Sequence, residues 1–182
     1  MRDKRFVAEH RGGLLTKEQH RQLILWACKC VENVLLLYTK TIDKRLTNAI
    51  KIAKEWAKEN ASVGDARNAS IDAIAVANEL TDPTNIAVAR SVGHAVATAH
   101  MADHSLRAAE YALKAVKLAD KSIDKERKWQ DKNLSPDIVD LVLSTRDKQK
   151  IKAKATTMNK QRTANFVLLP AGGKWKIASE EQ

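Results

Sequence analysis

Proline, glycine and aromatic residues are all scarce in this chain of 182 residues, and each shortage excludes a class of fold. Three prolines and six glycines are too few for a fold dominated by turns and short strands. Aromatic residues make up only 4% of the chain, so its core must be built from aliphatic side chains. No apolar run approaches the roughly 20 residues that a membrane-spanning helix needs. Together these shortages predict an all-α protein with no membrane partner.

Cysteine is scarce too, and the two that exist predict no disulfide. Cys28 and Cys30 lie two positions apart on an expected helix, where their side chains point about 200° away from each other. A C-x-C pair alone is a weak signal for a metal site. Residues 1–13 are charged and lack the apolar centre of a secretion signal. We therefore interpret both cysteines as ordinary thiols and expect a cytoplasmic protein.

Positive charge is in excess, and it is concentrated toward the C-terminus. The formal net charge is +10. From Arg146 onward nine lysines or arginines face three acidic residues, whereas the preceding part holds 23 against 19. A nucleic-acid-binding protein usually carries its basic surface on the folded domain. The charge distribution therefore gives only modest support to that role.

Apolar residues recur at helical spacing in successive segments between residues 16 and 146. Thr16 with Gln19 forms a capping-box pattern, and Ser62 and Asp82-Pro83 are further helix-start signals. The connections are short, which predicts antiparallel neighbours. We expect an arm over 1–15 with a turn at 11–13, then a compact bundle of about six to seven antiparallel helices over 16–146. The expected helices cover 16–38, 42–60, 62–80, the stretch following Asp82-Pro83, 103–119, 122–133 (anchored by Trp129) and 135–144.

The stretch 87–105 is apolar nearly all round, so we expect it at the centre of the bundle. It carries one thin polar stripe, and three of the five histidines in the chain lie within it. Buried polar groups need hydrogen-bond partners. The candidate polar or binding cluster is therefore Arg90, His94, Thr98, His100, Asp103 and His104.

These histidines allow several kinds of site. On a continuous helix His100 and His104 share one face, but a zinc site would want a third protein ligand, and Asp103 is expected to cap the next helix. A nucleophilic pair of Cys28 or Cys30 with His94 lacks any nucleophile motif. We favour histidines that hydrogen-bond to backbone or acidic groups where two helices meet, with a partner or ligand surface as the alternative. We expect no catalytic residue, metal or cofactor.

The residues after 146 differ in character, and we treat 147–182 as a basic tail. Lys148, Lys150, Lys152 and Lys154 occupy every second position, and the apolar helical pattern ends. Two β-like runs, 165–169 and 174–177, flank Gly172-Gly173 and form a possible small hairpin. The lysines could contact nucleic-acid phosphates. A solvated tail is the interpretation we favour.

Several short motifs in this chain resemble those of a known family. The resemblance covers about residues 5–146 and is most specific over 90–105. Together the motifs resemble the small helical immunity proteins of bacterial polymorphic toxin systems. They are Arg5-Phe6-Val7-Ala8, His10-Arg11-Gly12-Gly13, residues 15–20, Trp26-Ala27-Cys28, Ala53-Lys54-Glu55-Trp56, Gly64-Asp65-Ala66-Arg67 and residues 90–105.

The resemblance implies a non-enzymatic protein that blocks a cognate toxin by binding it, and it carries over no catalytic residue. Because the chain is basic, an acidic contact surface on the toxin fits better than the basic surface of a nuclease. Two alternatives remain open. One is a nucleic-acid-associated helical protein that uses the basic tail. The other is a small enzyme or ligand-binding domain with a pocket where His94, His100 and His104 converge.

Overall fold

The computed structural model describes residues 3–167, except for the side chains of 153–154 and 159–167. Over this range the chain forms seven α-helices and two short 3-10 helices, and it forms no strand. The all-α class is therefore confirmed. The helices are α1 (Lys17–Leu35), α2 (Lys44–Ala57), α3 (Val63–Glu79), α4 (Pro83–Ala97), α5 (His104–Leu118), α6 (Ile123–Lys132) and α7 (Pro136–Val167).

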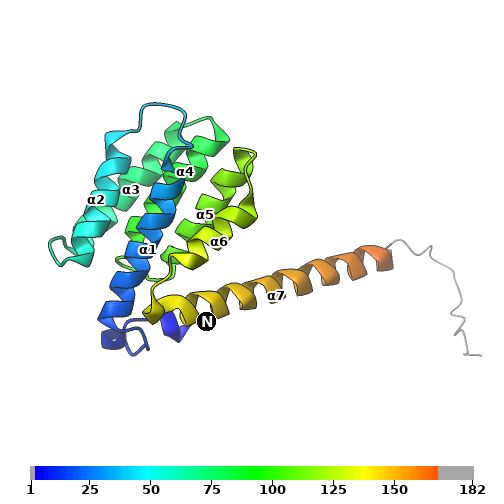
Figure 1. Cartoon of the computed structure of the whole chain (residues 1–182). Coiled ribbons are helices and arrows are strands. Elements are labelled where there is room, and N and C mark those ends of the chain that lie inside the picture. Colours follow the sequence, from blue (N-terminus) through cyan, green and yellow to red (C-terminus); the bar gives the residue numbers. More distant parts are fainter. Residues whose placement is uncertain (1–2, 168–182) are drawn as a thin grey trace, which may run out of the picture. The chain divides into compact units, whose positions relative to one another are not determined.

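Helices α1 to α6 form a bundle in which successive helices run in opposite directions (Figure 1). Helices α3, α4 and α5 lie side by side, and α1 and α2 pack across them. Helix α4 contacts α1, α2, α3 and α5, and most of its residues are buried. The prediction that this stretch lies at the centre of the bundle is therefore correct.

The predicted helix starts are formed as local sequence rules require. Thr16 and Gln19 exchange both hydrogen bonds of a capping box at the start of α1. Ser62 does the same with Asp65 at α3, and Asp82 caps α4 with Pro83 as its first residue. Each of these caps satisfies backbone N–H groups that would otherwise lack a partner at the helix end.

Helix α4 ends earlier than the sequence suggested. It stops at Ala97, and residues 98–103 form a turn before α5 begins at His104. The backbone bonds tighten there, because the N–H groups of Ala99 and His100 donate three residues back, to Val96 and Ala97. Asp103 occupies the position before α5, as predicted, but its side chain makes no capping bond. His100 and His104 therefore do not share one continuous helix.

Two polar side chains, and not Trp129, are the buried residues of α6. Glu126 and Gln130 are both buried, and Trp129 is only half-buried. The side-chain amide of Gln130 donates to the carbonyl oxygen of Ala109 (3.2 Å) and to Glu126 (3.0 Å), and the backbone carbonyl oxygen of Gln130 accepts from the indole of Trp26 (2.9 Å). These bonds join α6 to α1 and α5. The prediction that Trp129 anchors this helix was wrong.

Helix α7 continues well past its predicted end at residue 144 and reaches Val167. The chain divides into two compact units, Met1–Val142 and Leu143–Gln182, so α7 begins in the first and continues in the second. Its first turns place Ile138 and Val142 in the core of the first unit. Residues 165–167 are helical and do not start a hairpin; the rest of the predicted hairpin lies outside the described residues.

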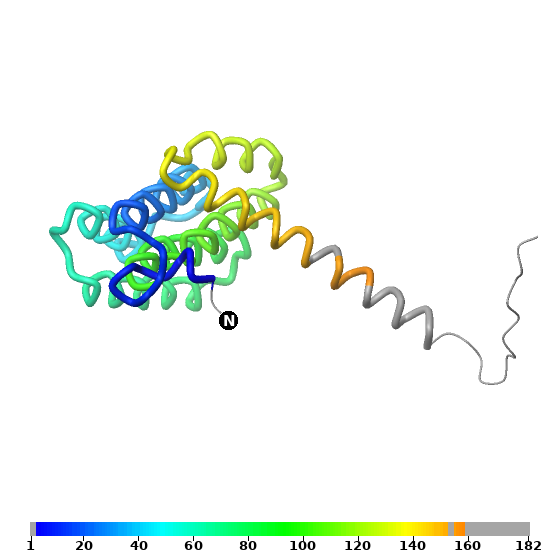
Figure 2. Tube along the Cα trace, turned by 90° about the horizontal axis from the view of Figure 1, so that it is seen from below, coloured from blue at the N-terminus to red at the C-terminus, as the bar shows by residue number. Residues whose placement is uncertain are grey.

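The N-terminal arm is folded and covers one end of the bundle (Figures 1 and 2). The 3-10 helices Lys4–Phe6 and Glu9–Arg11 are joined to the start of α1 by a turn that needs both glycines. Gly12 has a left-handed φ of 75°, and a Cβ on Gly13 would lie 1.9 Å from the carbonyl oxygen of Val7. The turn brings Phe6 and Leu15 into the core, where they are 2% and 1% exposed.

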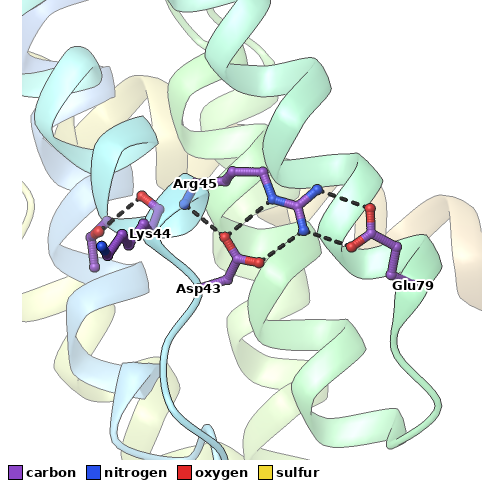
Figure 3. Close-up of polar contacts among 5 residues, drawn as sticks. Asp43, Lys44, Arg45 and Glu79 are labelled. Carbon is purple, nitrogen blue, oxygen red and sulfur yellow. Dashed lines mark hydrogen bonds and ion pairs between the residues drawn. The ribbon is translucent and has the colours of Figure 1, made fainter.

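At the opposite end of the bundle, Arg45 links α2 to the last residue of α3 (Figure 3). Its guanidinium donates to both carboxylate oxygens of Glu79 (2.9 and 2.6 Å) and of Asp43 (3.1 and 2.8 Å). Hydrogen bonds from Arg45 lower the pKa of both carboxyl groups. Bidentate geometry of this kind fixes orientation as well as charge.

The buried Gln130 gives a first prediction. Replacing it with alanine leaves the Ala109 carbonyl and Glu126 short of a donor and opens a cavity, so we expect Gln130→Ala to lower the free energy of unfolding by about 2–4 kcal/mol. Urea denaturation followed by circular dichroism measures the change. The exposed Lys128→Ala, on the same helix, is the control and should change stability by less than about 0.5 kcal/mol. Equal effects from the two variants would contradict this account.

Candidate functional site

The candidate site is a pocket of about 630 Å³ at the end of the bundle that the arm covers. Four segments that are far apart in the sequence line it: the N-terminal arm, the start of α1, the α2–α3 connection and the α4–α5 connection. Three of the five histidines, His10, His20 and His100, are among the lining residues. Pockets of this size bind small molecules in many proteins.

The walls of the pocket are largely apolar. Phe6 and Leu15 come from the arm, Ala99 and Ala102 from the α4–α5 connection, and Trp56 from the end of α2. The first four are buried, so the surface they present is part of the hydrophobic core. The apolar surface open at the pocket therefore comes from more exposed lining residues such as Trp56, which is half-buried, and Val63.

Charged groups gather at one side of the pocket. Lys17 Nζ lies 2.6 Å from a carboxylate oxygen of Glu59, and Arg21 pairs with the same oxygen. Glu59 itself follows α2 in a left-handed conformation, with φ 67°. Glycine is the usual residue at such a position, and a larger residue there costs on the order of 1 kcal/mol. The chain therefore holds a carboxylate between two cations at some conformational cost.

His20 connects the pocket to the end of α4. Its Nε2 lies 2.6 Å from the carbonyl oxygen of Thr98, and its ring packs on Trp56 with centroids 4.9 Å apart. A carbonyl oxygen only accepts hydrogen bonds, so Nε2 must carry a proton. The Thr98 hydroxyl donates to the carbonyl oxygen of His94 (3.1 Å). This buried threonine thus links the pocket to the histidine cluster beside it.

A column of rings lies between the end of α4 and α5. His94 is in contact with His104 (centroids 5.1 Å apart) on one side and with Tyr111 (5.2 Å) on the other. The Nδ1 atoms of the two histidines are 3.1 Å apart, so one must donate and the other accept. Arg90 reaches the Tyr111 hydroxyl at 3.4 Å, and its buried Nε finds no acceptor among the described residues.

The surroundings of His94 keep its imidazole neutral. Its pKa is lowered from the ordinary 6.5 to about 4, chiefly by burial and then by His104, Arg107 and Arg90. Two imidazolium ions in Nδ1-to-Nδ1 contact would repel each other and lose their hydrogen bond. In the hydrogen bond between the two rings, one Nδ1 therefore carries the proton and the other accepts it.

The structure brings most of the predicted cluster together, but in two groups. Arg90, His94 and His104 belong to the ring column, whereas His100 lines the pocket; His100 also contacts His104 with ring centroids 5.3 Å apart. His94 and His104 are not among the pocket-lining residues, so of the three histidines predicted to line a pocket only His100 does. Within residues 3–167 no group of three or more metal-ligating side chains is suitably placed for a metal ion.

The predicted lysines of the tail lie on a helix, which changes their arrangement. At 100° per residue, Lys148 and Lys152 share one face of α7, and Lys150 lies about 160° to 200° around from them. These three side chains are exposed, and Lys150 pairs with Asp147 at 3.1 Å; the side chain of Lys154 lies outside the described part. The lysines therefore do not form a single row, and nucleic-acid binding by the tail stays a prediction.

Cys28 lies in a setting unsuited to a nucleophile. It is fully buried, and burial raises the pKa of its thiol to about 12. The reactive form of cysteine is the thiolate. Neither cysteine takes part in a disulfide, as predicted.

Sequence patterns offered little reason to choose four residues of this site, His10, His20, Glu59 and Tyr111. Tyr111 is seven positions after His104, a helical spacing that places both on one face of α5. His10, His20 and Glu59 lie in segments that only the folded chain brings to the pocket. His10 and His20 belong to motifs that carry the family resemblance, whereas Glu59 and Tyr111 do not.

The fold and the site describe a small helical bundle hollowed at one end. The chain belongs to the family described as "Imm-5 like putative immunity protein", whose model matches residues 13–137. The matched residues include α1 to α6 and most of the pocket. No curated protein and no solved structure matches the chain. No helix within the described range is long and apolar enough to cross a membrane.

The lowered pKa of His94 predicts a pH-dependent stability. Below pH 6.5 the unfolded chain takes up a proton at this residue that the folded chain refuses until about pH 4, so stability falls as the pH falls between these values. Since the ring is only half-buried, solvent screening limits the loss to about 1–2 kcal/mol.

Urea denaturation between pH 7.5 and 4.5 measures this effect. His94→Gln removes the titrating group, so its free energy of unfolding should depend less on pH. Tyr111→Phe is the matched control, because it keeps the ring against His94 and should keep the full dependence. An unchanged slope in His94→Gln would show that other groups cause it.

Proposed function

We propose that this protein neutralises a cognate bacterial toxin by direct, stoichiometric and non-catalytic binding. The observation that carries the proposal is membership of an immunity-protein family over residues 13–137, which is most of the helical bundle. An immunity protein acts on a partner toxin, and a rigid bundle presents fixed helix faces to it. A complex of standard size would bury on the order of 1,600 Å².

The charge of the chain favours a toxin with an acidic contact surface. The net charge is +10, and exposed lysines occur on several helices, including Lys51 on α2, Lys117 on α5 and Lys128 on α6. Complementary charge mainly speeds association and suppresses wrong partners. The association rate of the complex should therefore fall as salt is added.

Co-expression with the toxin encoded beside this gene tests the proposal. We expect the chain to restore growth, and the purified mixture to contain a one-to-one complex by size-exclusion chromatography with light scattering. Titrating the chain against a fixed amount of toxin should bring the toxin's activity to zero at equimolar protein. An unrelated toxin of the same activity is the specificity control.

Two outcomes would contradict the proposal. Complete neutralisation by much less than one equivalent would show that the chain acts catalytically. For the charge argument, Lys51→Glu, Lys117→Glu and Lys128→Glu sample three helices, and at least one should slow association. An association rate that neither salt nor any of these reversals changes would rule out an acidic contact surface.

A further inference from the structure

We propose that the pocket at the arm-covered end binds a small compound that combines an apolar body with one carboxylate. This proposal concerns the chain alone and does not depend on the toxin. Its basis is a cavity of about 630 Å³ in which buried apolar walls lie beside a surplus of cationic side chains.

The shape of the site favours a small ligand. Protein-protein contacts are mostly broad surfaces, whereas small ligands occupy concave sites of about 300–1,000 Å³. Here the arm and the α4–α5 connection supply the walls through Phe6, Leu15, Ala99 and Ala102, and Trp56 adds an aromatic surface. An apolar body in this space would cover the exposed apolar surface of Trp56 and Val63.

The charged side of the site selects an anion. Lys17 and Arg21 both pair with the carboxylate of Glu59, and Arg21 also lies 3.7 Å from a carboxylate oxygen of Glu18. Among the residues that line the pocket, three cationic side chains, Arg11, Lys17 and Arg21, outnumber the two carboxylates, Glu9 and Glu59. Arg21 is 25% exposed and Lys17 is 72% exposed, so water screens the charge of Arg21 less than that of Lys17. A carboxylate fits the fork of an arginine in bidentate geometry.

The carboxylate of Glu59 pairs with Lys17 and Arg21, so the carboxylate of such a ligand would have to displace it. Glu59 adopts a left-handed backbone conformation that favours glycine, yet it offers its carboxylate to the same two cations. Its side chain is 54% exposed, and ion pairs of exposed side chains are weak. A ligand carboxylate that also buries an apolar body therefore competes well with it.

Isothermal titration of the full chain with 2-naphthoate tests the proposal, with the neutral 2-naphthamide as comparison. We expect 2-naphthoate to bind at one site per chain and 2-naphthamide to bind at least about tenfold more weakly, because it lacks the charge that pairs with Arg21. Equal affinities for the two compounds, or no binding of either, would overturn the proposal.

Four variants locate the site. Arg21→Gln should weaken 2-naphthoate binding by about tenfold, since it removes a charge-assisted hydrogen bond. Ala61→Trp, in the α2–α3 connection, should fill the pocket and abolish binding. Lys51→Gln removes an exposed charge outside the pocket and is the matched control. Circular dichroism confirms that each variant is folded.

Glu59→Gln is the sharpest test, because it should strengthen 2-naphthoate binding, whereas Arg21→Gln and Ala61→Trp should weaken it. Glu59→Gln removes the competing carboxylate but keeps a residue of the same size in the same backbone conformation, so 2-naphthoate should bind about threefold more tightly. If Lys17 and Arg21 served only to hold the fold together, this change would leave the affinity the same or lower. An unchanged or weakened affinity in Glu59→Gln would therefore contradict the proposal that the ligand carboxylate displaces that of Glu59.

Discussion

The burial of α4 on all sides is the constraint on which the rest of the structure depends. Neighbours can approach it closely because its buried residues are mostly small; a Cβ on Gly93 would lie 2.7 Å from Ile74 of α3. Close approach leaves no room for water, so each buried polar group needs a protein partner. Two such hydrogen bonds cross to the neighbouring helices: Ser91 donates to the carbonyl oxygen of Ala108 at 2.7 Å, and Ser70 of α3 donates to that of Gly93 at 3.0 Å. These bonds help to place α3 and α5 beside α4.

The turn at the end of α4 positions residues of both the pocket and the ring column. Where the helix tightens after Ala97, the carbonyl oxygen of Thr98 is available to His20 of α1, and this bond draws the start of α1 to the α4–α5 connection. The same turn carries His100 to the pocket and leaves His94 beside His104. One helix end thus positions two groups of histidines with different surroundings. The pocket and the ring column are consequences of the same chain reversal.

The sequence predicted what short-range chemistry decides. Capping boxes at Thr16 and Ser62 involve residues three apart, and apolar spacing within one helix shows its buried face, so these features were correct. The end of α4 was missed because residues 98–102 do not exclude a helix; the contact of Thr98 with His20, 78 positions away, takes part in ending it. Gln130 replaced Trp129 as the buried residue of α6 for a similar reason, since only the folded chain shows that its amide meets Ala109. The continuation of α7 was missed because lysine-rich segments lack an apolar pattern yet favour helix.

The arm-covered end of the bundle places charged side chains beside a cavity. Elsewhere charged side chains serve the fold directly, as when Arg45 joins two helices through a pair of carboxylates. Here a non-glycine residue stands in a left-handed conformation, and an apolar cavity remains beside the core. Local departures from the most stable arrangement, within an otherwise regular fold, are typical of sites that bind something. Asp120, after α5, also has a left-handed φ of 54°, so this conformation does not by itself mark a site; at Glu59 it coincides with a cavity. The proposed ligand would use both features.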